Sequence, residues 1–323
     1  MHVIEYNPAT STTANTQRKG TKMELTSALT DKDNALLRIM LYGNAKQRKT
    51  WWAGAAAMQP ELSVLFLECD GNYGILRNLP TEAQQRIKLI DIKDTLTNAT
   101  AIEFMTYFLR ATPFTWDEKE KRRLVMSDSP NATAFDASKL TPDTVLVIDS
   151  WTALVNSIAL RFALENNIDL SDATKPEWEG YRWCGALANW ILSQLKALNC
   201  HIIVICHADI YEKRTTKMVH GKEKTIVEFT RTQAKSISYK HAMQLPKNFM
   251  DILYFYTQGH QVKIDTNIAT DRDGGCVTAP PGVYNWEDLQ FTDLYAILTG
   301  NKEVQLKQSK PTAIGSLNKL LSK

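Results

Sequence analysis

The sequence has no hydrophobic run long enough to cross a membrane and no cysteine spacing typical of a metal site. A membrane-spanning helix needs ~20 consecutive apolar residues, and no stretch of the 323 residues approaches that length. The cysteines form no CxxC pair, which excludes the common zinc frameworks and favours reduced thiols. Four histidines also show no ligand spacing, so we predict no structural metal; they are His2, His220, His241 and His260.

The chain also has little excess charge of either sign. It carries 38 basic and 35 acidic residues, a net charge of +3, so any nucleic-acid interpretation depends on where the basic residues lie. The N-terminus lacks the charged-then-apolar plan of a signal peptide, and we expect a cytoplasmic protein. The length allows one large α/β domain with appendages. We predict a flexible arm at 1–30, a main domain at 31–300 and a basic tail at 301–323.

The loop from Gly43 to Thr50 lacks one glycine of the phosphate-binding pattern that it otherwise matches. A short apolar run ends at Gly43, a polar loop follows, and Lys49 and Thr50 open a helix-compatible segment. The spacing matches the phosphate-binding pattern G-x-x-x-x-G-K-[ST], except that Arg48 occupies the second glycine position. Arg48 would either crowd the loop or direct a cation at the phosphates, and the alternative is a plain polar turn. The predicted nucleotide-binding residues are Gly43, Asn44, Ala45, Lys46, Gln47, Arg48, Lys49 and Thr50.

Apolar runs separated by helical patterns predict an α/β fold. Short buried strands are expected at 36–42, 62–67, 87–92, 144–148 and 201–206, and helices at 53–58, 101–110, 151–165 and 176–198. Such strands form a mostly parallel sheet with helices on both faces. Residues 111–142 are charged and turn-rich, which predicts a long surface excursion. Short β-like runs between 212 and 264 predict a C-terminal β extension.

Polar residues follow several of these strands, and they converge in the predicted sheet. The carboxyl ends of parallel strands meet at one edge, where ligands bind. Lys49 would reach phosphates, and Thr50 and Asp149 would hold Mg²⁺, although an aspartate after a strand is also a common helix N-cap. Either Asp70 or Glu68 would polarise the attacking water, unless they lie in a solvated turn. His207 would sense the γ-phosphate or serve as a structural histidine.

These motifs resemble those of the RecA-like P-loop ATPases encoded by bacteriophages, in the group associated with single-strand annealing and recombination. The loop Gly43–Thr50 matches the first nucleotide motif except at Arg48, and the run 66–71 resembles the strand that ends in acid-x-acid-Gly. Runs 145–150 and 203–207 resemble the metal-binding and sensor strands. The similarity covers about residues 35–300, in the family's order. It implies a RecA-like fold, ATP and Mg²⁺ as cofactors, and Asp70 rather than Glu68 as the water-activating carboxylate.

A basic stretch follows the sensor strand. Residues 212–247 contain nine basic and three acidic side chains, a local excess of +6. The resemblance implies a mobile loop or hairpin here that approaches DNA. The residues themselves suit this, because lysines and arginines would contact phosphates and Phe229 or Tyr239 would stack on bases; the alternative is a solvated basic hairpin without a ligand. The predicted DNA-binding residues are Lys213, Arg214, Lys217, Lys222, Lys224, Arg231, Lys235 and Lys240.

Three hypotheses follow from the sequence. The first is an ATP-binding, ATP-hydrolysing protein that acts on single-stranded DNA in phage recombination or replication, as a homo-oligomer in the host bacterial cytoplasm. The second, favoured by Arg48, is a descendant of this fold that does not hydrolyse ATP and serves as a DNA-binding or scaffolding protein. The third is a helicase- or primase-associated loader. A phage single-strand-binding or replication protein is a candidate partner.

Overall fold

A computed structural model describes residues 35–116, 124–126, 135–168, 178–219, 222–300, 304 and 306–309. The predicted arm at 1–30 and most of the predicted tail at 301–323 lie outside these residues, as does part of the excursion at 111–142. A short separate ribbon within that excursion pairs strands β4 (Phe114–Trp116) and β5 (Leu124–Met126). No helix in the described ranges is long and apolar enough to cross a membrane.

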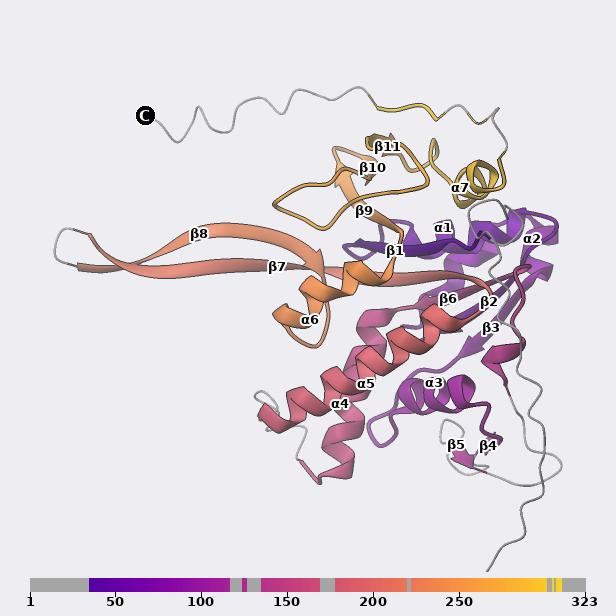
Figure 1. Ribbon diagram of the computed structural model, residues 1–323, viewed down its shortest axis with the longest axis horizontal. Helices are drawn as coiled ribbons and strands as arrows, with labels where there is room; N and C mark the ends of the chain where they lie inside the picture. Colours follow the sequence, from indigo (N-terminus) through magenta and orange to yellow (C-terminus); the bar gives the residue numbers. More distant parts are fainter. Residues whose placement is uncertain are drawn as a thin grey trace, which may run out of the picture. The chain divides into compact units, whose positions relative to one another are not determined.

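A nine-stranded, mostly parallel sheet forms the centre of the fold (Figure 1). Its strand order is β11-β10-β9-β1-β7-β6-β2-β3, with β8 paired to β7 outside this row. The parallel strands are β1 (Arg38–Gly43), β2 (Ser63–Glu68), β3 (Ile87–Asp91), β6 (Thr144–Asp149), β7 (His201–Val219) and β9 (Asp251–Gln258). The antiparallel strands are β8 (Lys222–Ala234), β10 (Gln261–Asp265) and β11 (Val283–Asn285).

Helices cover both faces of the sheet, and each face has its own apolar core. Helices α3 (Thr100–Arg110), α4 (Trp151–Glu165) and α5 (Trp178–Ala197) pack on one face, together with Met40 and Tyr42 of β1. The other face, with Ile39 and Leu41, packs against α1 (Lys49–Gly54), the 3-10 helix Ala55–Met58 and α7 (Phe291–Leu298). Alternate residues of a strand point to opposite faces, so β1 contributes to both cores. Further helices are α2 (Thr81–Gln85) and α6 (Tyr239–Gln244), with 3-10 turns at Tyr73–Asn78, Ala137–Lys139 and Leu245–Asn248.

The predicted α/β class, the mostly parallel sheet and its helical covering are confirmed. Each of the five predicted strands overlaps an observed one, and the helices at 101–110, 151–165 and 176–198 are present. Three expectations were wrong in detail. The strand expected at 201–206 continues to Val219, and β9, expected in a peripheral extension, pairs in parallel with β1 at the centre of the sheet. The helix expected from Ala53 begins at Lys49.

Strands β7 and β8 leave the sheet as a long hairpin (Figure 1). The part of β7 from His201 to His207 pairs with β1 and β6, whereas the part from Ala208 pairs only with β8. A β-bulge interrupts the ladder at Lys213/Arg214. Because two strands alone bury little surface, the side chains at 223–230 are all exposed. The hairpin therefore presents its side chains directly to solvent.

A buried histidine at the start of β7 makes stability depend on pH. The Nδ1 atom of His201 accepts a hydrogen bond from the Leu37 backbone N–H at 3.0 Å, and the side chain is buried. Burial, helped by the Arg38 charge, lowers the pKa of His201 to about 4. Unfolding returns the pKa of His201 to about 6.5. Between about pH 6.5 and pH 4, the unfolded chain therefore binds more protons than the folded chain does. Acidification therefore favours unfolding through His201.

We expect His201→Asn to weaken this pH dependence, because asparagine does not titrate there. In the wild type, His201 alone should lower the free energy of unfolding by about 2 kcal/mol between pH 7 and pH 5. Urea unfolding of both proteins at the two pH values measures the difference. The same loss of stability in wild type and variant would show that other groups cause the acid sensitivity.

Candidate functional site

The loop between β1 and α1 is tightly folded. Gly43 is required at its start, because a Cβ there would collide with the Phe255 carbonyl oxygen and with the Gln47 side chain. Lys46 and Arg48 both have φ near +63°, the left-handed region that side chains rarely adopt. Backbone in this conformation turns N–H groups toward the inside of a loop and favours anions there. The loop ends where α1 begins, at Lys49.

Lys49 lies inside the loop. Its side chain is 5% exposed, and Nζ donates to the carbonyl oxygens of Gly43 (3.0 Å) and Asn44 (2.6 Å). Burial lowers the pKa of Lys49 to about 8, and the carboxylates of Asp149 and Asp70 counter this only in part. The ammonium group is therefore positive at neutral pH and poorly hydrated. Such a charge attracts a phosphate more strongly than a solvated lysine does.

Thr50 and Asp149 meet beside the loop. The Thr50 hydroxyl donates to Asp149 Oδ2 at 2.6 Å, although 99 residues separate the two positions in sequence. Burial, reinforced by the Glu68 charge, raises the pKa of Asp149 to about 7. The N-cap of α4 is Ser150, whose Oγ accepts from the Ala153 backbone N–H. Asp149 therefore does not cap this helix, which was the alternative interpretation of its position.

Asp70 and His207 come together from different strand ends. His207 Nε2 lies 3.1 Å from Asp70 Oδ2, and the Ser150 hydroxyl donates to the same oxygen at 2.7 Å. Burial alone would raise the pKa of Asp70, but the hydrogen bonds from His207 and Ser150 outweigh it and hold the pKa below its usual value. Asp70 is therefore ionised at neutral pH. The His207 backbone N–H also donates to Thr152 at the start of α4.

Glu68 occupies a different environment from Asp70. Its side chain is fully buried, and Oε1 accepts the backbone N–H groups of Asp70, Gly71 and Asn72. Burial raises the pKa of Glu68 in spite of these bonds. The other oxygen, Oε2, has no hydrogen-bond partner among the described residues. Glu68 thus holds the turn that carries Asp70, and this arrangement favours Asp70 over Glu68 for contact with a ligand.

Arg48, the departure from the loop pattern, has an aromatic partner. Its guanidinium lies over the Trp286 ring, 4.4 Å from the ring centroid. Trp51 meets the same ring edge-on, with ring centroids 5.1 Å apart. Trp286 directly follows β11, so these contacts join the loop and the start of α1 to the C-terminal part of the sheet.

Trp52 belongs to the core rather than to the loop site. Its ring is fully buried and meets Phe255 and Phe291 edge-on, with centroids 6.2 and 6.1 Å away. The indole Nε1 donates to the Leu289 carbonyl oxygen at 2.7 Å. A fully buried ring has no free face for a nucleotide base, so Trp52 serves to fix α1 against the sheet.

Four of the predicted DNA-binding residues lie exposed on or beside the hairpin without an ion-pair partner among the described residues. Lys217 and Lys224 are exposed and face each other across the two strands. Lys235 and Lys240 lie exposed beyond the end of β8. The backbone of Lys222 opens β8. The exposed side chains of Lys217 and Lys224 are open to an anionic partner, and their contact with DNA stays a prediction.

Two further predicted DNA-binding residues already have acidic neighbours. Lys213 pairs with Glu228 at 2.6 Å, and Arg214 pairs with Glu212 at 2.7 Å. Both pairs lie on the exposed surface of the hairpin, where ion pairs contribute little to stability. These cations are therefore available to phosphates only in competition with a carboxylate.

Arg231 has a structural role at the base of the hairpin. Its guanidinium donates to Asp273 Oδ1 at 2.6 Å and to the Thr270 carbonyl oxygen at 3.2 Å. Asp273 is buried, so this ion pair fixes β8 to the loop that follows β10. The predicted contact of Arg231 with DNA would have to form beside this ion pair, and it stays a prediction.

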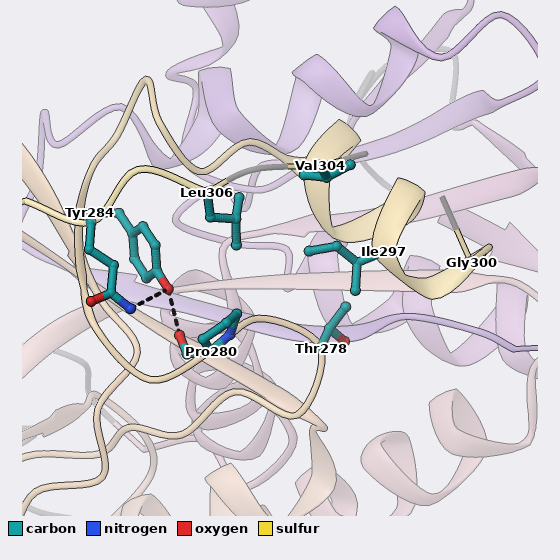
Figure 2. Close-up of a pocket in the computed structure, with 8 residues that line it drawn as sticks. Thr278, Pro280, Tyr284, Ile297, Gly300, Val304 and Leu306 are labelled. Atoms are coloured by element: carbon teal, nitrogen blue, oxygen red, sulfur yellow. Dashed lines mark hydrogen bonds between the residues drawn. The ribbon is translucent and has the colours of Figure 1, made fainter. Parts of the chain in front are cut away.

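A separate cavity of about 800 Å³ lies near the C-terminal end of the described chain (Figure 2). Thr278, Pro280, Ile297 and Leu306 line it, and the Tyr284 hydroxyl donates to the Pro280 carbonyl at 2.7 Å. Its lining includes none of the described residues that we predict to contact phosphate. The cavity is therefore distinct from the loop site.

The residues around the loop suit ATP with Mg²⁺ in their donor chemistry. Mg²⁺ prefers oxygen ligands and is usually held by one or two protein groups together with phosphates, which fits the Thr50 hydroxyl and the Asp149 carboxylate. The described residues contain no group of three or more His, Cys, Asp or Glu side chains that would hold a metal by itself. Any magnesium here would therefore depend on the nucleotide for further ligands.

Two members of the site were not predicted from the sequence. Ser150 donates to Asp70, and its position directly after Asp149 at a helix start was a usable signal for a side chain at this edge. Trp286 contacts Arg48, but the two lie far apart in sequence and no local pattern connects them. The residues that the sequence did place at strand ends are brought together by the structure: Lys49, Thr50, Asp70, Asp149 and His207.

Comparisons with known proteins identify no family. No protein-family model matches the chain, and no curated protein matches it. Among solved structures, the crystal structure of the RadB recombinase is similar over 76% of this chain and 86% of that chain, with 13% sequence identity and a TM-score of 0.37. At this level of similarity, we infer neither family membership nor activity from it.

Proposed function

We propose that this chain is a RecA-like P-loop protein that binds ATP with Mg²⁺ and acts on single-stranded DNA in recombination or replication. The observation that carries the proposal is the convergence of three features at the carboxyl edge of the sheet. Lys49 lies within the loop, Thr50 contacts Asp149, and Asp70 contacts His207. Lys49, Thr50 and Asp70 lie just after β1 and β2, Asp149 ends β6, and His207 lies where β7 leaves the sheet. Nucleotide hydrolysis requires a cation, a metal site and a group that orients the attacking water.

Each group has a role in this proposal. The loop N–H groups and the Lys49 ammonium bind the phosphates, and Thr50 and Asp149 hold Mg²⁺, which would neutralise phosphate charge. Asp70 accepts a hydrogen bond from the attacking water and orients it. Ser150 and His207 fix the Asp70 carboxylate, since both lie within hydrogen-bond distance of Oδ2. His207 also precedes the part of β7 that leads into the hairpin, so it connects the nucleotide site with the DNA-binding segment.

The hairpin supplies the DNA-binding part of the proposal. Lys217 lies opposite Lys224, and like charges directly opposite each other destabilise a sheet; the Glu228 carboxylate, which also pairs with Lys213, offsets this only in part. A polyanion such as DNA would relieve this repulsion. Lysine contacts with phosphates give affinity that does not depend on sequence and weakens with salt. Homo-oligomer formation and a phage single-strand-binding partner also belong to this proposal.

We expect a Lys217→Gln/Lys224→Gln variant to bind single-stranded DNA with a weaker salt dependence. Each lost phosphate contact lowers the slope of log affinity against log salt by about 0.7, so the double variant should lose about 1.4. Fluorescence anisotropy with labelled oligo(dT) over a range of salt concentrations measures this slope.

The matched control changes two lysines elsewhere. Lys88 lies exposed on β3, at the far edge of the sheet from the hairpin, and Lys196 is exposed in the last turn of α5. Lys88→Gln/Lys196→Gln alters net charge equally and should keep the wild-type slope. If both double variants lowered the slope equally, net charge rather than the hairpin would explain DNA binding.

A second candidate function is a protein of this fold that does not hydrolyse ATP, which the Arg48 departure favours. The Arg48 guanidinium lies over the Trp286 ring and forms no contact of this kind with a described residue of the loop. In Arg48→Gly, relief of left-handed strain of about 1 kcal/mol and loss of a cation–π contact of about 0.5–1 kcal/mol should nearly cancel. We therefore expect the free energy of unfolding to change by less than about 1 kcal/mol. Because the guanidinium contacts Trp286, the first proposed function predicts that hydrolysis changes by less than about tenfold.

Steady-state phosphate release by wild type and Arg48→Gly distinguishes the candidates. A large increase in the variant would show that Arg48 blocks hydrolysis and would support the second function. A large decrease would show that Arg48 acts on the phosphates. The third hypothesis, a helicase- or primase-associated loader, requires a protein partner, and hydrolysis with DNA alone would contradict it.

A further inference from the structure

A cleft of about 400 Å³ lies at the base of the hairpin. Phe229 and Arg231 of β8 form one side, Tyr239 and Met243 of α6 another, and Thr270 belongs to the loop after β10. The loop residues around Lys49 do not line it. The cleft combines ring faces with polar atoms, a composition typical of sites for flat heterocycles.

Aromatic rings at the cleft are held in place before any ligand binds. Phe229 is 41% exposed and Tyr239 is 37% exposed, although both are large and largely apolar. Tyr211 stacks on Tyr239 with ring centroids 3.7 Å apart and planes at 21°, and its ring lies 6.0 Å from that of Phe229. Tyr211 thus supports one side of the aromatic cluster. Pre-ordered rings lose little conformational entropy when a base stacks on them.

Basic side chains lie around the cleft, and one acidic residue, Asp271, also lines it. The Arg231 guanidinium is tied to Asp273 and to the Thr270 carbonyl, which joins two walls of the cleft. Lys240 follows Tyr239 directly and is exposed, and Lys213 is the cross-strand partner of Phe229. Cations beside exposed rings are the combination by which proteins bind single strands, through phosphates and bases respectively.

We propose that this cleft binds one unpaired nucleobase of single-stranded DNA, stacked on Phe229 and Tyr239, while neighbouring lysines bind the flanking phosphates. This inference rests on the proposed DNA-binding function of the hairpin and adds a base-binding site to it. A base within a duplex is stacked and paired, so it does not enter such a cleft. The cleft therefore gives the protein its selectivity for single strands over double strands.

The test compares oligo(dT) with an abasic oligonucleotide of equal length, which keeps the phosphates and removes the bases. Wild type should bind oligo(dT) at least about tenfold more tightly, since stacking stabilises each bound base appreciably. In Phe229→Leu/Tyr239→Leu, this preference should fall severalfold while the salt slope stays unchanged. Tyr239→Phe keeps the ring and should keep the preference. Met218→Ala changes an exposed apolar hairpin residue outside the cleft and should also keep it.

The outcomes separate this inference from the proposed function. Equal wild-type affinity for both oligonucleotides would overturn the base site and leave a phosphate-binding hairpin. A preference that survives in the double leucine variant would place the base elsewhere and would also overturn it. Failure of wild type to bind either oligonucleotide would contradict the proposed DNA-binding function itself. Circular dichroism of each variant verifies that it is folded.

Discussion

Asp70→Asn should reduce ATP hydrolysis at least about 100-fold while leaving the affinity for ATP with Mg²⁺ nearly unchanged, since a positioned base contributes about 10²–10⁴-fold. The carboxylate is ionised, because the hydrogen bonds from His207 and Ser150 outweigh the effect of burial and hold its pKa below the usual value. Asparagine keeps the size of the side chain and removes the charge that orients water. Phosphate release at saturating ATP, together with nucleotide titration, measures both quantities.

A matched control uses the same substitution at the end of the neighbouring strand. Asp91 ends β3 beside β2 and forms an ion pair with Lys93 at 3.2 Å. Asp91→Asn should leave hydrolysis at the wild-type rate. An unchanged rate in Asp70→Asn would remove Asp70 from the mechanism, and an equal loss in both variants would indicate a general effect of lost charge at this edge.

Lys49→Ala should lower the affinity for ATP at least about 100-fold, because it removes a buried charge whose attraction to phosphate is little screened by water. The ammonium donates to two carbonyl oxygens, and no carboxylate among the described residues forms an ion pair with it. Burial disfavours its charged form, as the pKa of about 8 shows. The free energy of unfolding should therefore not fall along with nucleotide affinity.

Equilibrium binding of a fluorescent ATP analogue and urea unfolding, both on the same variant, separate lost binding from lost folding. Lys196→Ala serves as the control, because it removes one exposed lysine of α5. Wild-type affinity in Lys49→Ala would contradict the assignment of the phosphate loop. The assignment would also be contradicted if the variant lost ATP binding only to the extent that it lost folded protein.

The sequence predicted the centre of this fold because buried parallel strands are continuous apolar runs. Val145–Ile148 and Ile202–Cys206 have no polar residue, and the polar groups that follow them, Asp149 and His207, could be placed at one edge from strand order alone. The 3.1 Å contact of His207 with Asp70 confirms that strand ends far apart in sequence converge. Their chemical roles remain predictions.

The hairpin and the start of α1 were harder to predict. Beyond His207, β7 pairs only with β8 and has no buried face, so its sequence of lysines, threonines and other polar residues shows no regular apolar pattern. The helix begins earlier than expected because Trp52, a residue without strong helix preference, is buried against Phe255 and Phe291. The phosphate-loop pattern already marked Lys49 and Thr50 as the opening of a helix-compatible segment, whereas the packing of Trp52 against β9 and α7 was not visible in the local sequence.

The most direct test of the central claim is the titration of wild-type protein with a fluorescent, non-hydrolysable ATP analogue, with and without Mg²⁺. We predict saturable binding at one site per chain that tightens when Mg²⁺ is added, because Thr50 and Asp149 together provide oxygen ligands beside the loop. Absence of binding under both conditions would contradict the claim that this loop, with Arg48 in place of glycine, is a nucleotide site.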